Sequence, residues 1–181
     1  MKTFADYKIL ADSSFYICFL DDINSHDCLV KIVIEFDFIL PPIVHSEIQK
    51  SKNYSVIKNC KDIVPFSLYY DVSSILKPFF GNQEIKKGEH EVIGYAYFLN
   101  ENRDKFYFIL DEDGPRKFVE RNFPILAPLM KGTAKFLGMC ACEFYIMSKQ
   151  EVRDVLILIE NSPFRITKNI LDKVRLYLEG C

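Results

Sequence analysis

YKILAD, from Tyr7 to Asp12, is the stretch on which the expected fold depends. It is a short apolar run that ends in an acidic residue and is followed by two serines, which is typical of a buried strand that gives way to a polar turn. KFYFIL, residues 105–110, repeats the pattern and is followed by Asp111. Short apolar segments alternate with helical patterns along the chain. This alternation predicts an α/β fold of three layers, α/β/α, with a mostly parallel central sheet.

The remaining expected elements follow from the spacing of apolar residues and from proline and glycine positions. Further strands are expected at FILPP (38–42), within IVPFSL (63–68) and at FPILAP (123–128). Helices are expected at 13–23, 26–36, 43–51, on either side of the strand in 53–80, and at 86–101, 114–122, 129–139, 148–162 and 167–180. The segment 26–36 is rich in β-branched residues, so a strand is the alternative there.

Length and composition indicate one globular domain. The chain has 181 residues, of which 49% are hydrophobic and 27% charged, and no linker or repeat divides it. We therefore expect a single domain over 1–181, with C-terminal helices from about residue 148 packing on it. The net charge of −2 excludes a protein that coats nucleic acid through bulk positive charge. Any nucleic-acid contact must come from a local basic patch.

The sequence also predicts a cytoplasmic location with no membrane association. It contains no apolar run of about 18 residues and no pattern of a signal peptide at its start. Six cysteines are present, but no two CxxC pairs, so a zinc site is not expected. Without a secretory signal, buried reduced thiols are the expected state of these cysteines.

Acidic residues are the candidates for chemistry. Asp12 and Asp111 each follow a strand, and parallel strands place their carboxyl ends at one edge of the sheet, so we expect the two to lie side by side. Glu47 and Glu89 lie on expected helices, and Asp113 follows Asp111 closely. Mg²⁺ and Mn²⁺ prefer carboxylate oxygens, and such ions support phosphodiester cleavage. Taken singly, each acid is better explained as a helix cap or a solvated surface residue, and only the two acids at strand ends, taken together, favour a site equally well.

Six segments, in order, resemble successive elements of PIN-domain nucleases, and in particular a subfamily related to toxin–antitoxin ribonucleases. They are ILADSS, LPPIVHSEI, GEHEVIGYAYFL, FILDEDGPRKFVERNFP, LMKGTAKFLGM and SPFRITKNILDKV. The resemblance runs from Lys8 to about Leu178, although residues 50–87 match no motif, and Ile109 stands where many PIN domains have Thr. It implies a PIN-like fold.

The resemblance also implies roles for individual residues. The acids matched to metal-binding and catalytic positions are Asp12, Glu47, Glu89 and Asp111, with Asp113 as a further metal ligand. Ser14, or alternatively Ser13, matches the supporting hydroxyl, and Glu91 competes with Glu89 for the third acidic position. Arg116 and Lys117 follow the second acidic turn and would bind RNA phosphates, unless they belong to a solvated helix face.

The function that the resemblance implies is that of a hydrolase, a metal-dependent endoribonuclease that uses Mg²⁺ or Mn²⁺. RNA is the expected substrate, an antitoxin protein and a second copy of the chain are the expected partners, and a toxin role follows by analogy alone. Two alternatives remain open: an inactive PIN scaffold that binds a protein or RNA, and a metal-dependent nuclease that acts on DNA. The sequence indicates no particular RNA target.

Overall fold

The sheet has five parallel strands. A computed structural model describes residues 4–60, 63–65, 72–80 and 87–181. Its strands are β1 (Phe4–Ala11), β2 (Phe36–Leu40), β3 (Ile63–Pro65), β4 (Phe106–Ile109) and β5 (Met130–Lys131), and they lie in the order β3-β2-β1-β4-β5. All four neighbouring pairs are parallel. The prediction of an α/β fold with a parallel central sheet is therefore confirmed.

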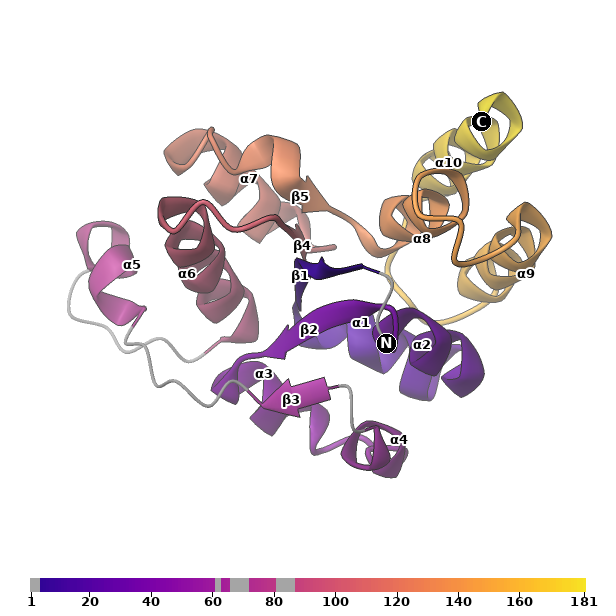
Figure 1. The fold of residues 1–181 in the computed structure, drawn as a ribbon, viewed down its shortest axis with the longest axis horizontal. Coiled ribbons are helices and arrows are strands. Elements are labelled where there is room, and N and C mark those ends of the chain that lie inside the picture. Colours follow the sequence, from indigo (N-terminus) through magenta and orange to yellow (C-terminus); the bar gives the residue numbers. More distant parts are fainter. Residues whose placement is uncertain (1–3, 61–62, 66–71, 81–86) are drawn as a thin grey trace.

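Helices cover both faces of this sheet, as Figure 1 shows. They are α1 (Ser13–Ile17), its π-helical continuation η1 (Cys18–Asp22), α2 (His26–Val33), α3 (Pro42–Ile48), α4 (Ser55–Asn59), α5 (Ser73–Phe80), α6 (Gly88–Glu101), α7 (Asp113–Asn122), the 3-10 turn η2 (Ala127–Leu129), α8 (Thr133–Cys142), α9 (Lys149–Glu160) and α10 (Lys168–Gly180). In Figure 1, α5, α6 and α7 lie on one side of β1 and β4, and α8, α9 and α10 lie on the other. None of the described helices is long and apolar enough to cross a membrane.

Most of the expected elements are confirmed, including the helix at 26–33, so the strand alternative for that segment is wrong. The expected strand FPILAP is also wrong. Its backbone forms turns, in which the N–H of Leu126 donates to the carbonyl of Phe123 at 2.8 Å. Pro124 and Pro128 have no N–H with which to join a ladder, and the fifth strand forms at Met130–Lys131 instead. Residues 66–68 of the expected strand at 63–68 lie outside the described residues.

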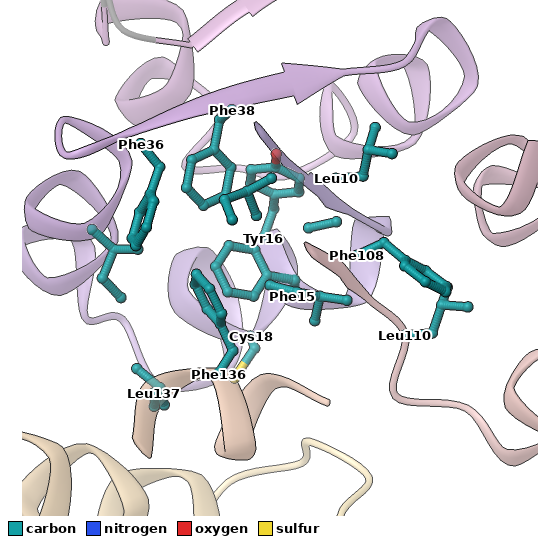
Figure 2. Close-up of a cluster of buried hydrophobic side chains, with 14 of the residues drawn as sticks. Leu10, Phe15, Tyr16, Cys18, Phe36, Phe38, Phe108, Leu110, Phe136 and Leu137 are labelled. Atoms are coloured by element: carbon teal, nitrogen blue, oxygen red, sulfur yellow. The ribbon is translucent and has the colours of Figure 1, made fainter. Parts of the chain in front are cut away.

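An aromatic cluster joins α1, β2 and α8 in the core (Figure 2). The ring of Phe15 stacks on Phe38 at 5.9 Å between centroids and meets Phe136 edge-on at 6.3 Å. Phe36 contacts Phe136 at 5.7 Å. Such ring pairs stabilise a core beyond their buried area. Because Phe15 lies three residues after Asp12 and is fully buried, this packing also fixes where α1 begins.

The C-terminal helices pack against α8. A Cβ atom on Gly138 would lie 3.1 Å from Tyr177 and from Val174, so this glycine lets α10 approach closely. Cys142 at the end of α8 is disulfide-bonded to Cys181, with 5.7 Å between their Cα atoms. The expectation that all six cysteines are reduced is therefore wrong for this pair. The spacing of two cysteines in the sequence could not show that α10 folds back to bring them together.

Candidate active site

Asp12 follows β1 directly and caps helix α1. Its Oδ1 atom accepts hydrogen bonds from the Ser14 hydroxyl at 2.6 Å and from the Phe15 N–H at 3.2 Å. An Asp at this position satisfies N–H groups that have no partner inside the helix. The side chain is only 5% exposed. Of the two serines considered from the sequence, Ser14 is the one that bonds to the carboxylate.

Asp111 reaches the same edge of the sheet from β4. Ala11 pairs with Ile109 in the parallel register, and the N–H of Asp12 donates to the carbonyl of Ile109 at 3.2 Å. The carboxylate of Asp111 is held by Thr133 at the start of α8, whose N–H donates to Oδ1 at 2.8 Å and whose hydroxyl donates to Oδ2 at 2.6 Å. Sequence reasoning missed Thr133, although a Gly-Thr pair directly after a short strand is a signal for such a cap.

The two aspartates are electrostatically coupled. Burial raises the pKa of both, and the negative charge of Asp111 together with that of Glu89 raises the pKa of Asp12 further, to about 7. Neither aspartate forms an ion pair with a basic side chain within the described ranges. A pair of this kind is stable near neutral pH only with a bound proton or a bound cation.

The two candidate glutamates of helix α6, Glu89 and Glu91, have different contacts. Glu91 is 5% exposed, and its Oε2 atom accepts the N–H groups of Ile43 at 2.7 Å and Val44 at 3.2 Å at the start of α3. Glu89 has a side chain that is 18% exposed, lies 3.4 Å from the Lys87 ammonium, and acts on the pKa of Asp12. Of the two glutamates, Glu89 contributes to the raised pKa of Asp12, whereas Glu91 is engaged at the start of α3.

Glu47 lies on α3 and reaches the start of α6. Its Oε1 atom accepts the N–H of Gly88 at 3.1 Å. A Cβ atom on Gly88 would lie 2.5 Å from Glu47 Oε2 and 2.9 Å from Val44, so only glycine allows this approach. One oxygen of the predicted second acid is therefore engaged in holding α6, and the charge of Glu47 contributes to the raised pKa of Glu91.

The remaining predicted residues, Asp113, Arg116 and Lys117, lie on helix α7, which follows β4 and Asp111. Asp113 begins α7 with a side chain that is 87% exposed and lies 3.7 Å from the Lys117 ammonium, so both point to solvent. Arg116 turns inward. Its Nη1 atom donates to the carbonyl of Leu110 at 2.8 Å, and its charge lowers the pKa of Asp111 against the effect of burial. Only Arg116 of the two predicted RNA-binding residues lies close to the aspartate pair.

The aspartate pair fits a hard divalent cation by its chemistry. Asp12 is buried and Asp111 half-buried, neither forms an ion pair with a basic side chain in the described residues, and each is oriented by a hydroxyl, from Ser14 or Thr133. Oxygen donors of this kind suit Mg²⁺ or Mn²⁺ with part of the coordination left to water. No three His, Cys, Asp or Glu side chains in the described part of the chain are close enough together to hold an ion by themselves.

A pocket of about 850 Å³ opens beside Asp111. Its walls come from α1 and η1, the turn after β4, the start of α8, and the segment between α9 and α10. The basic side chains in its lining are Arg116, Lys135 and Arg165. Sequence reasoning identified only the first of these as a site residue, because Lys135 and Arg165 lie on elements whose packing could not be predicted.

Comparison of the chain with protein-family models, with curated proteins and with solved structures finds no match.

Proposed function

We propose that this chain is a metal-dependent endoribonuclease of the PIN type. One observation carries the proposal: Asp12, which is buried, and Asp111, which is half-buried, are mutually repelling carboxylates at the carboxyl ends of adjacent parallel strands. Edges of this kind are the usual ligand sites of open α/β sheets. Raised pKa values of carboxyl groups beside a cleft cluster at functional sites.

The roles of the residues follow from their contacts. A bound Mg²⁺ or Mn²⁺ would supply charge neutralisation and water activation for phosphodiester hydrolysis. Asp12 and Asp111 would hold the cation, the charge of Glu89 would add to the negative field at Asp12, and Ser14 and Thr133 would keep the two aspartates in place. Arg116, anchored through one nitrogen to Leu110, would face the phosphate of the substrate.

Cleavage of RNA by the purified protein tests this proposal. A mixed pool of labelled RNA is incubated with Mn²⁺, with Mg²⁺ or with EDTA, using the wild type, Asp12→Asn and Asp111→Asn, and Glu101→Gln as a control at an exposed acid of α6. The expected result is cutting that requires a metal, is lost in both aspartate variants and is retained in the control. Cutting that persists in EDTA or in Asp12→Asn would refute the proposal. A parallel panel of DNA substrates decides between RNA and DNA.

The second candidate function is a PIN-like scaffold without catalysis. It is favoured by the engagement of Glu47 with Gly88, which leaves fewer free carboxylate oxygens than four converging acids would offer. Calorimetry with Mn²⁺ separates the two: no binding to the wild type, together with no cutting, would support the scaffold. A toxin role, an antitoxin partner and a homodimer remain proposals that rest on the resemblance described above.

A further inference from the structure

Helices α8 and α10 run in the same direction and are joined at their ends by a disulfide. The start of α8 lines the pocket beside Asp111 through Lys135, and the start of α10 lines it through Ile170. Cys142, the last residue of α8, is bonded to Cys181, which directly follows α10. Both helices therefore begin at the pocket and end at the disulfide.

The packing that holds α10 on α8 is confined to a narrow face. Leu171, Val174 and Leu178 are the buried residues of α10, and Val174 meets α8 at Gly138. The helix has 13 residues, and its N-cap residue, Thr167, makes no side-chain hydrogen bond to the helix start. A helix of this length is marginal without tertiary contacts, so α10 depends on its attachment to α8.

Polar contacts of α10 add little to this attachment. The Tyr177 hydroxyl donates to the Glu143 carboxylate at 2.6 Å, and Arg175 pairs with Glu160 at the end of α9. Exposed or partly exposed pairs of this kind contribute little to stability. A disulfide that spans a sequence separation of 39 constrains the chain far more. The bond therefore supplies a large share of what holds α10 in place.

The segment 163–166, between α9 and α10, forms a wall of the pocket and has two supports. On one side it is tied to α9, because the N–H of Phe164 donates to the Ser162 hydroxyl at 3.1 Å, and that hydroxyl donates to the carbonyl of Ile159 at 2.8 Å. On the other side it runs directly into α10, whose Ile170 completes the wall. Movement of α10 away from α8 would therefore open the pocket from this side.

The disulfide is open to reductants at one of its two residues. Cys181 is exposed, whereas Cys142 is buried. A thiolate of a dithiol attacks the sulfur of Cys181, the S–S bond breaks, and the electron pair leaves on the sulfur of Cys142, which takes up a proton. The second thiol of the reductant then releases Cys181 as a thiol, so the two electrons and two protons that the cysteines gain come from the dithiol, which becomes a disulfide. Burial raises the pKa of the thiols of Cys18, Cys28 and Cys140, which keeps them out of this exchange.

We infer that the disulfide between Cys142 and Cys181 is a redox-sensitive tie, which keeps the α9–α10 segment closed as a wall of the pocket beside Asp111 and lets it open when a dithiol reduces the bond. Reduction removes the covalent attachment at the end of α10, so the start of the helix, with Ile170, leaves the pocket more often. Regulation of the aspartate pair by this route rests on the proposed nuclease function, whereas the opening of the wall does not.

Hydrogen exchange followed by mass spectrometry tests the inference without metal or nucleic acid. The full chain is compared before and after treatment with dithiothreitol, and thiols are counted in denatured samples to show that the bond is present and is then reduced. Cys181→Ser removes the bond at its exposed residue, where a serine leaves no packing defect. Cys60→Ser, at a half-buried free cysteine, is the matched control. Peptides from β1 and β4 report on the rest of the fold.

Reduction of the wild type is expected to speed exchange in peptides from residues 163–180 by about a hundredfold, which is the effect of releasing a constraint on a loop of this size. Peptides from β1 and β4 should stay protected over the same period, because the central strands open only when the whole domain unfolds. Cys181→Ser should show the fast exchange with or without dithiothreitol. Cys60→Ser should respond to the reductant like the wild type.

Unchanged exchange in residues 163–180 after full reduction would overturn the inference, as would slow exchange in Cys181→Ser or six free thiols in the untreated protein. A parallel rise in the β1 and β4 peptides would overturn it too, because the bond would then stabilise the whole fold and not the wall. Failure of the nuclease proposal is distinguishable. A protein that shows the expected exchange but cuts no nucleic acid with Mn²⁺ keeps the redox-sensitive tie and loses the catalytic site, and one that cuts RNA without responding to the reductant does the reverse.

Discussion

Glu47 and Glu91 cap each other's helices. Glu47, on α3, accepts the N–H of Gly88 at the start of α6, and Glu91, on α6, accepts the N–H groups of Ile43 and Val44 at the start of α3. Each carboxylate thus satisfies N–H groups that a helix start leaves without a partner. Residues two apart on a helix point in different directions, so Glu91 can face α3 while Glu89 lies beside Lys87 and acts on Asp12 through its charge.

Replacing Glu91 by alanine should destabilise the fold, whereas replacing Glu89 should not. Glu91→Ala leaves two N–H groups at the buried start of α3 without an acceptor, which costs about 2 kcal/mol. Glu89→Ala removes a partly exposed side chain and should lower metal affinity with little change in the free energy of unfolding. Urea denaturation and calorimetry with Mn²⁺ measure the two effects. If Glu91 acted on the metal and Glu89 capped the helix, Glu91→Ala would lose metal affinity and Glu89→Ala would be the destabilised variant.

Gly88→Ala should be destabilising by about 1–3 kcal/mol. The added methyl group would lie 2.5 Å from Glu47 Oε2 and 2.9 Å from Val44, so both side chains must move and the hydrogen bond from Gly88 to Glu47 is disturbed. Gly114→Ala is the matched control, since nothing lies within 4 Å of its added Cβ. Thermal melts of the two variants provide the comparison. Equal stability of both would show that the α3–α6 contact is looser than the structure indicates.

The stability of the metal-free protein should fall as pH rises, and Asp12→Asn should remove much of that fall. The pKa of Asp12 is raised from 3.8 to about 7 in the folded chain, so the folded state holds a proton that the unfolded state releases between these values. The loss of folding stability grows from about pH 4 to pH 7 and is then complete, on the order of 4 kcal/mol. Asparagine retains the cap on α1 without the charge.

Denaturation in EDTA at several pH values measures this effect. Above pH 7 the Asp12→Asn variant should be the more stable protein, and near pH 4 the two should agree. Saturating Mn²⁺ should restore the wild type at pH 8 and have little effect on the variant. Parallel stability curves for the two proteins across this range would contradict the assignment of a raised pKa to Asp12.

Cys142→Ser should destabilise the protein under non-reducing conditions. The disulfide to Cys181 spans a sequence separation of 39, for which the loop-entropy relation gives about 4 kcal/mol as the constraint on the unfolded chain. Dithiothreitol should lower the melting temperature of the wild type and leave Cys142→Ser unchanged. Cys60→Ser, at a free and half-buried cysteine, is the control and should respond to the reductant like the wild type. Titration of six free thiols in the unreduced, denatured wild type would disprove the bond.

The convergence of Asp12 and Asp111 could be predicted from the sequence, because both follow apolar strands and parallel strands end at one edge. The choice between Glu89 and Glu91 could not. Both lie in the first turn of α6, and only the position of α3 shows which of them meets its N–H groups. That position depends on packing between segments that are far apart in the sequence.

The wrong strand prediction and the missed pocket residues have a similar origin. FPILAP has the composition of a strand, but two prolines interrupt its hydrogen-bonding capacity, and the neighbouring Met130 and Lys131 join the sheet instead. The pocket wall at Phe164 and Arg165 belongs to a segment that resembles the family, but neither residue was predicted to lie at the site. Its role depends on α10 packing against α8, which the closeness allowed by Gly138 makes possible.

The mutual capping of α3 and α6 also governs how this region opens. Loss of either carboxylate contact exposes N–H groups of one helix and withdraws the support of the other, so the two helix starts should unfold locally as one cooperative unit. The amide protons of Val44 and Gly88 would then exchange with solvent at similar rates, although they lie on different helices. Glu89, one residue beyond Gly88, would move in the same event, so its charge would act on Asp12 only while both helix starts are intact.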